Sequence, residues 1–533
     1  MLSLRAGLAR ALIADSQPQA AIEILEEVDE IGLGANGSDH PNRLARFVTL
    51  GTAYQANGQT QKAIEVFDEA LRLSKFDEGH PNRLDTQYEL SIAYLAQGQT
   101  KKAISLLEKT KSMQEKTMEH DHPTVVRVRT ELGNAYSQAG QYKKAIRLLE
   151  NAAEIQNAKL DEAHPNRLGT QYQLGLAYLN DGQLGENEEA LALLQKVADL
   201  ESSHGDQNAE SALATRRALA KALLANGQAQ KAVNQYEAVM QVQSRSLAAN
   251  HPDALDTKQQ LGSAYLSLNR AEDAITCLKQ AVAGYAGTLE PCHTARLTAG
   301  HRLAKAYIQG ARKEDAMAVL EEIVRNAAHL GAGHPNMLAF KYDLAQCYLQ
   351  CGRPQEAVTR IKEVLAVEDA MLQKDDPSRI KTVRLLGYAY LSLGSARDAI
   401  GCFAEISLIL SDTFGAKDAR YLSAQNDLAV AYVDDCQPKK AIPILREALT
   451  TAREAAAPGC DLVMKLQYEL ATAHTDAKRP DRAIPLLEEI VQIKLKDATV
   501  AYPSWEKLRA SLADAHKTKL AWHASIALRP RRE

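Results

Sequence analysis

Histidine followed by proline recurs along the chain, and imidazoles at regular spacing could bind a metal or transfer protons. The pairs begin at His40, His80, His122, His164, His251 and His334. In the same phase the chain places Asp376 and Asp418, and aspartate caps a helix by accepting a backbone N–H bond. We therefore interpret each His-Pro pair as the N-cap and first residue of a helix, with no shared chemical role.

Two further patterns could carry chemistry. Cys347 and Cys351 share a helix face, but no histidine lies in phase with them, so we expect reduced thiols rather than metal ligands. A GxGxxG stretch at residues 32–37 has no strand before it, which favours a turn over a dinucleotide site. No GxSxG, HExxH, paired-carboxylate or Cys/His arrangement stands out. The sequence predicts a non-enzymatic protein with no cofactor and no metal.

The element that repeats is a residue, usually aromatic, that returns about every 42 positions and is called the marker below. It falls at Leu12, Tyr54, Tyr94, Tyr136, Tyr178, Leu223, Tyr265, Tyr307, Tyr348, Tyr390, Tyr432, His474 and His516. Apolar residues at helical spacing precede and follow it, so each unit is expected to hold two helices. A left-handed residue should end the first helix four positions after the marker. These residues are Gly58, Gly98, Gly140, Gly182, Gly227, Asn269, Gly352 and Gly394.

Such a period predicts one all-α repeat array rather than several globular domains. We expect a single solenoid over residues 1–533, built from about 12–13 helix-turn-helix units. The expected units are 1–39, 40–79, 80–121, 122–163, 164–208, 209–250, 251–292, 293–333, 334–375, 376–417, 418–459, 460–501 and 502–533. Spacing departs most between Tyr178 and Leu223, where three extra residues in Leu184–Glu188 predict a longer turn.

Composition narrows the class of protein. The net charge is −4, 45% of residues are hydrophobic, and no run of 18 apolar residues could span a bilayer. The seven cysteines form no CxxC pair, so neither a disulfide framework nor a zinc site is indicated. We expect a cytoplasmic protein with no affinity for nucleic acid and no membrane segment.

The pattern of Leu132-Gly133, Tyr136, Ala145 and Leu149 resembles the tetratricopeptide repeat (TPR). That resemblance implies a right-handed α-solenoid that binds a protein or peptide. The 42-residue unit with its His-Pro opening, and the phrase Ala441-Ile442-Pro443, resemble the kinesin light chain subclass. His80-Pro81-Asn82-Arg83-Leu84 followed by Tyr88-Glu89-Leu90 is most similar to the arrays of fungal NOD-like receptors, the NACHT/NB-ARC-TPR proteins.

The resemblance leaves three functions open: the sensor array of such a receptor, a kinesin light chain-like cargo adaptor, and the regulatory C-terminal part of an enzyme or ATPase. The chain shows neither the heptad coiled coil of the adaptors nor a GxxxxGK[ST] phosphate loop. Met1 falls within the start of a first helix, with no polar capping helix before it. We expect the C-terminal part of a longer protein or a free-standing remnant of one.

The resemblance also implies that first-helix residues nine, six and two positions before each marker line the inner face. Of 39 such positions nine are basic and three acidic, where average composition would give about five of each. Four tyrosines share one of these phases. The candidate peptide-binding residues are Tyr88, Arg127, Tyr172, Arg217, Lys221, Lys305, Tyr342, Lys381, Arg384, Lys465 and Tyr468. They predict a groove for a segment with acidic groups, and the alternative is a solvated polar face.

Overall fold

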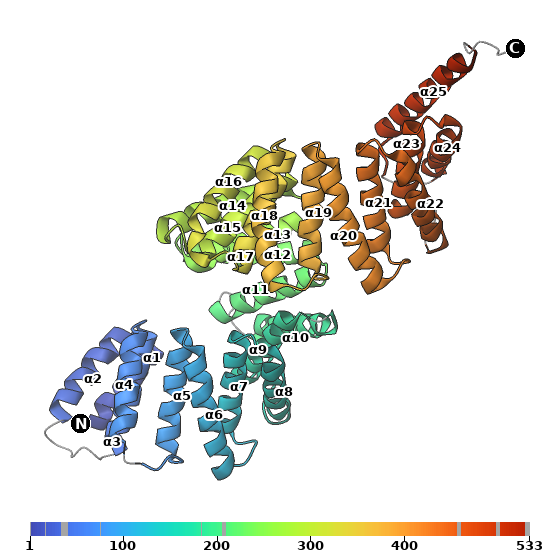
Figure 1. The fold of residues 1–533 in the computed structure, drawn as a ribbon. Helices are drawn as coiled ribbons and strands as arrows, with labels where there is room; N and C mark the ends of the chain where they lie inside the picture. Colours follow the sequence, from blue (N-terminus) through green and yellow to red (C-terminus); the bar gives the residue numbers. More distant parts are fainter. Residues whose placement is uncertain are drawn as a thin grey trace. The chain divides into compact units, whose positions relative to one another are not determined.

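The computed structural model describes residues 2–15, 17–32, 41–74, 76–182, 184–204, 209–455, 460–496 and 502–527. Within these ranges the chain is all-helical, with twenty-five α-helices, one short 3-10 helix and no strand (Figure 1). Two compact units divide it, Met1–Leu268 and Asn269–Glu533, called unit 1 and unit 2 below. The all-α prediction is confirmed, whereas the single solenoid and its thirteen boundaries stay predictions.

First and second helices alternate as twelve pairs, followed by one more first helix in the described part of the chain. The first helices are α1 Leu2–Ala14, α3 Pro41–Ala56, α5 Pro81–Ala96, α7 Pro123–Gln138, α9 Pro165–Asp181, α11 Glu210–Ala225, α13 Pro252–Ser267, α15 Thr294–Gln309, α17 Pro335–Gln350, α19 Pro377–Ser392, α21 Ala419–Asp434, α23 Asp461–Asp476 and α25 Trp505–Ala527.

The second helices show the same regularity. They are α2 Pro18–Gly32, α4 Thr60–Leu73, α6 Thr100–Thr117, α8 Tyr142–Lys159, α10 Leu184–His204, α12 Ala229–Ser246, α14 Ala271–Thr288, α16 Lys313–Asn326, α18 Pro354–Met371, α20 Ala396–Phe414, α22 Pro438–Ala455 and α24 Pro480–Lys496. The 3-10 helix is Ala328–Leu330. Four of these helices begin at proline, as expected where the missing N–H is one that a first turn leaves unpaired.

The histidines before first helices are N-caps. His122 Nδ1 accepts a hydrogen bond from the Thr124 backbone N–H at 3.3 Å, and the Asp376 carboxylate accepts from Ser378 N–H at 2.8 Å. Imidazole and carboxylate thus do the same work at equivalent positions. The cap prediction is confirmed at His80, His122, His164, His251, His334, Asp376 and Asp418, and His293 acts alike; His40 lies outside the described residues.

The turn between the two helices of a repeat contains one residue in the left-handed conformation. Gly140 has φ of 73°, and the N–H of Gln141 after it donates to the carbonyl oxygen of the marker Tyr136 at 2.9 Å. All eight residues expected there have positive φ. Three residues other than glycine, Ala311, Cys436 and Lys478, also have positive φ four positions after a marker. The sequence did not predict these three.

The hydrophobic core forms where the two helices of each repeat pack against each other. The alanine nine residues after the marker is fully buried in eleven pairs, and tyrosine markers such as Tyr136, 7% exposed, lie nearby. Between them, Gly133 lets the Leu149 side chain approach so closely that a Cβ there would lie 2.7 Å from Leu149 Cγ. A small residue therefore fixes the spacing of the helix pair.

Two local expectations fare differently. The longer turn at Leu184–Glu188 is wrong, because these residues form the first turns of α10 and lengthen that helix. Glutamate-containing segments propagate a helix readily, so the insertion extends an existing element. The GxGxxG stretch at residues 32–37 lies almost wholly outside the described residues.

Chemical sites of other kinds are not evident in the described ranges. No group of three or more His, Cys, Asp or Glu side chains is placed to hold a metal ion there. Cys347 is fully buried, and burial raises the pKa of its thiol to about 12. No described helix is both long and apolar enough to cross a membrane.

Candidate functional site

First helices of successive repeats lie side by side within each unit: α5 contacts α7 and α21 contacts α23, and side-chain contacts join α15 to α17 and α19 to α21. We call the residues nine, six and two positions before the markers the first-helix face. All eleven candidate residues occupy these positions, which form three rows along successive first helices. Side-chain contacts between neighbouring first helices show which of them come together.

In unit 1, Arg127 on α7 reaches back to the preceding first helix. Its Nη2 lies 3.0 Å from Asp85 Oδ1, and its guanidinium carbon lies 4.2 Å from the centre of the Tyr88 ring. Tyr88 is only 8% exposed beneath it, so the guanidinium provides most of the accessible surface here. The structure therefore brings Tyr88 and Arg127 together as a stacked pair.

The remaining candidates in unit 1 lie farther along. Arg217 Nη1 lies 3.3 Å from Asp253 Oδ1 on α13, and Lys221 Nζ donates to Asn180 Oδ1 at 2.9 Å. Tyr172 lines a pocket of about 370 Å³ between α9, α10 and α11, together with small and apolar side chains. Burial is the main cause that raises the Tyr172 pKa, so its hydroxyl stays protonated.

In unit 2, Asp343 on α17 gathers two side chains from α15. His301 Nε2 lies 2.6 Å from Asp343 Oδ2, and Lys305 Nζ lies 3.8 Å from the same oxygen. The carboxylate is only 17% exposed, whereas Lys305 is 54% exposed. Tyr342, the neighbour of Asp343, is partly buried, and burial first and the Asp343 charge second raise its pKa.

Asp427 on α21 lies next to the first-helix face, with its side chain only 2% exposed. Arg384 Nε of α19 lies 3.4 Å from its Oδ2, and Lys465 Nζ of α23 lies 3.6 Å from its Oδ1. Among described residues, neither Arg384 Nε nor Asp427 Oδ2 makes a hydrogen bond, and the buried Asn426 amide beside them has no partner either. One buried carboxylate thus links the cations of two repeats, with polar groups left unsatisfied.

The last two candidates stand apart. Lys381 on α19 is exposed, and no described residue forms an ion pair with it. The Tyr468 hydroxyl lies 2.7 Å from Ser511 Oγ of α25, and its ring meets Tyr502 edge to face at 5.8 Å. Lys381 is therefore an open cation, while Tyr468 is largely engaged within the fold.

The sequence reading overlooked a fourth row, five positions before each marker. Five of its thirteen residues are acidic and one is basic. The acids are Glu89, Glu131, Asp343, Asp427 and Glu469. Burial raises the pKa values of Glu89, Glu131 and Glu469. Counted with this row, the surface holds ten basic and eight acidic residues, and of the five acids in the row Asp343 and Asp427 form ion pairs with its cations.

Comparison with known families agrees with this geometry. Residues 1–75, 47–116, 82–158, 124–201 and 210–287 match the family described as Tetratricopeptide repeat, and together they cover 279 of 533 residues. The chain belongs to the tetratricopeptide repeat family. The TPR prediction is thereby confirmed.

Solved structures give further likenesses. Two structures of a putative kinesin light chain from Podosopora anserina, described as having nearly identical TPR-like repeats, are 35% identical over 40% of this chain and 98% or 99% of theirs, with a TM-score of 0.36. The apo quorum sensor NprR from B. thuringiensis is 14% identical over 69% of this chain and 98% of its own, with a TM-score of 0.51. Apo RapI is 10% identical over 70% of this chain and 99% of its own, with a TM-score of 0.52. The latter two show the fold alone. No curated protein sequence matches the chain.

Proposed function

We propose that this TPR protein is a non-enzymatic scaffold whose first-helix face binds an extended or helical segment of a partner protein that carries acidic side chains. The observation that supports the proposal is that two acidic side chains of this surface are largely buried while the lysines beside them are more exposed. Asp343 and Asp427 are 17% and 2% exposed, whereas Lys305 and Lys465 beside them are 54% and 36% exposed. Buried carboxylates therefore hold ammonium groups at the surface, where remaining N–H donors can meet a ligand.

Two further features support a segment rather than a small molecule. Arg127 and Lys381 offer exposed cations, and the pocket beside Tyr172 is lined by apolar side chains such as Leu168 and Leu200. Within unit 1, a segment laid along the face could place a carboxylate on Arg127 and an apolar side chain in this pocket. The unsatisfied amide of Asn426 and Arg384 Nε would also gain partners if such a segment displaced their present neighbours.

For the cellular role, we propose the sensor array of a fungal NOD-like receptor or a relative. The support is the resemblance of the His80–Leu90 phrase and its copies to those arrays. The alternatives are a kinesin light chain-like cargo adaptor and the regulatory part of an enzyme or ATPase. A nucleotide-binding module encoded ahead of Met1 favours the receptor or the ATPase, and a heptad coiled coil there favours the adaptor.

The test starts from a partner captured with the 1–533 chain from its own cell extract. Its affinity is then measured at low and high salt for the wild type, Lys381→Glu and Lys439→Glu. Lys439 is the matched control, because it is an exposed lysine of the same unit on the second helix α22.

We expect Lys381→Glu to weaken binding by roughly fivefold and to reduce its salt dependence, because one ion pair to the segment is lost. Lys439→Glu should bind as the wild type does. If both variants bind equally well at every salt concentration, or if no saturable partner is captured, the assignment of the first-helix face is wrong.

A further inference from the structure

Several tyrosine markers share a hydrogen bond to a glutamate of the preceding repeat, whereas Tyr307 and Tyr390 have a lysine, Lys279 or Lys362, beside the ring at the equivalent position. The Tyr178 hydroxyl donates to Glu150 Oε1 at 2.6 Å, and Tyr265 donates to Glu237 Oε1 at 2.6 Å, each glutamate lying 28 residues earlier. Tyr136 donates to Glu108 in the same way, and Lys144, eight residues after it, lies 5.1 Å from the ring centre. We call each such contact between a marker and the preceding repeat a marker corner. It joins an aromatic ring to a carboxylate, and in some repeats a cation also lies beside the ring.

At the marker corner of His474, an arginine replaces the glutamate, so the charge there is positive instead of negative. Histidine takes the place of the marker tyrosine, and Arg446 stands 28 residues earlier, where Glu108, Glu150 and Glu237 stand in other repeats. Arg479 and Arg482 follow five and eight residues after His474, so the cations of the pattern remain. The carboxylate has become a third arginine, and no described residue forms an ion pair or hydrogen bond with any of these three guanidinium groups.

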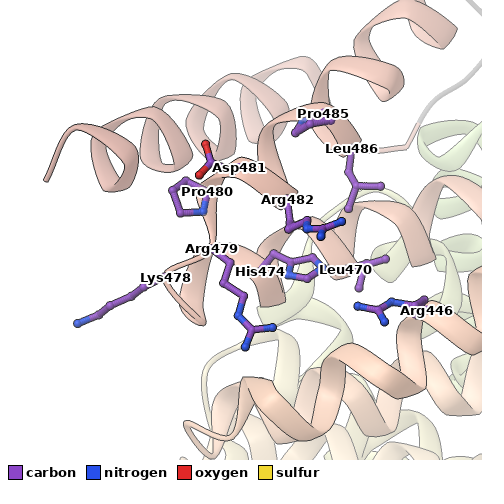
Figure 2. A pocket seen from close by; sticks show the side chains of 10 residues that line it. All are labelled: Arg446, Leu470, His474, Lys478, Arg479, Pro480, Asp481, Arg482, Pro485 and Leu486. Atoms are coloured by element: carbon purple, nitrogen blue, oxygen red, sulfur yellow. The ribbon is translucent and has the colours of Figure 1, made fainter. Parts of the chain in front are cut away.

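These side chains surround a pocket of about 990 Å³ between α22, α23 and α24 (Figure 2). Figure 2 shows the imidazole of His474 between Arg446, Arg479 and Arg482, while Lys478 points away from it. His474 is only 4% exposed, and its Nδ1 has no hydrogen-bond partner among described residues. Burial first, and the charges of the three arginines second, lower the pKa of His474.

The acid nearest the pocket does not supply the missing charge. Asp481 lines the pocket beside Pro480, but its carboxylate pairs with Lys519 of α25 at 3.1 Å. The N-terminus of α24, which begins at Pro480, adds the positive end of a helix dipole to the same border. Leu470 and Leu486 complete the wall.

We propose that this pocket binds a phosphate group, with Arg446, Arg479 and Arg482 contacting its oxygens above His474. A phosphate dianion matches three guanidinium groups better than a carboxylate does, because it has three terminal oxygens and twice the charge. The anion would take the place that glutamate fills in other repeats. Phosphate binding itself does not rest on the proposed function, although a phosphorylated segment of the partner would be one source of the group.

The first experiment titrates the full chain with inorganic phosphate by calorimetry at constant ionic strength. The decisive variant is Arg446→Glu/His474→Tyr, which rebuilds the tyrosine–glutamate pair of the other repeats and should fold. We expect one phosphate per wild-type chain and binding at least about tenfold weaker in the variant. Lys439→Ala is the control and should bind as the wild type does, because this exposed lysine of α22 does not line the pocket.

A second variant guards against misfolding of the first. Arg479→Gln/Arg482→Gln changes only exposed side chains, so its thermal unfolding should match that of the wild type while phosphate binding falls by about tenfold. A wild-type chain that shows no saturable heat over the millimolar range, or variants that bind phosphate as tightly as the wild type, would overturn the proposal. So would acetate that competes as well as phosphate.

Histidine NMR then locates the bound group and its source. Phosphate should raise the pKa of His474, identified through His474→Gln, because the anion offsets the arginine charges; phosphate that leaves this pKa unchanged binds elsewhere, which contradicts the proposal. Blocked phosphoserine that binds more tightly than inorganic phosphate assigns the site to a phosphorylated segment, and the reverse order assigns it to free phosphate. Equal binding of blocked serine without phosphate would overturn both.

Discussion

Arg127 on α7 and Asp85 on α5 form an ion pair at 3.0 Å between first helices of successive repeats. The two residues are 42 positions apart, which is the repeat period, so the pair connects equivalent positions of adjacent repeats within unit 1. Related contacts join α15 to α17 through Asp343 and α19 to α23 through Asp427. The same side chains that could meet a partner therefore also join the repeats to one another.

The coupling between Arg127 and Asp85 should be measurable. A double-mutant cycle with Arg127→Ala and Asp85→Ala, followed by native-state hydrogen exchange of α5 and α7, is expected to give about 0.2–1 kcal/mol, the usual range for exposed pairs. Part of the Arg127→Ala effect should persist in the Asp85→Ala background, because Tyr88 loses its covering guanidinium. Strictly additive effects would show that the contact stabilises nothing.

Tyr136→Ala should destabilise its repeat by about 3–5 kcal/mol, because the ring is 7% exposed and its removal leaves a cavity. Tyr136→Phe should cost less, since only the hydrogen bond to Glu108 is lost. Urea unfolding followed by circular dichroism tests both. Equal losses in the two variants would mean that the hydroxyl rather than the ring is the stabilising group.

Gly133→Ala should destabilise the chain by about 1–3 kcal/mol, because a Cβ would lie 2.7 Å from Leu149 Cγ in a close-packed pair of helices. The matched control is Gly169→Ala on α9, where no atom lies within 4 Å of the added Cβ. That variant should be neutral or more stable by about 0.5–1 kcal/mol, as expected for alanine in a helix. Thermal melting in which both variants fall equally would contradict the packing role of Gly133.

Glu131 gives a pH-dependent prediction. Burial raises its pKa above the ordinary value of 4.5, and the bond from Asn134 and the charge of Arg127 only partly oppose this. Its contribution to stability is therefore fully present below about pH 4.5 and is lost as pH rises through the folded-state pKa. Glu131→Gln should raise the urea midpoint at pH 7, and the gain should shrink on acidification. A gain independent of pH would argue against a buried charge as its cause.

Local features of this fold could be predicted from the sequence, because each depends on neighbouring residues. His122 before Pro123 indicates a cap, and Gly140 after Tyr136 indicates a left-handed turn. The prediction of a longer turn at Leu184–Glu188 was wrong, because extra residues can lengthen either a turn or a helix. The spacing of the markers does not distinguish the two.

The chemistry of the candidate surface was harder to predict. The prediction considered three positions in each first helix, whereas Asp343 and Asp427 lie one position from one of these and form ion pairs with Lys305, Arg384 and Lys465. His474 and Arg446 were equally hidden, because they lie in helices of adjacent repeats 28 residues apart. Their reversal of charge becomes visible only after the structure shows that Tyr178 meets Glu150 at the same level.

The most direct test of partner binding on the first-helix face is site-specific photocrosslinking in cell extract. A photoreactive amino acid replaces Lys381 on α19 in one chain and Lys439 on α22 in another, both exposed positions of unit 2. We predict a saturable adduct with a partner segment rich in acidic residues from position 381, suppressed by excess unlabelled wild-type chain, and none from position 439. Adducts from position 439 alone, or equal adducts from both positions, would contradict binding on this face.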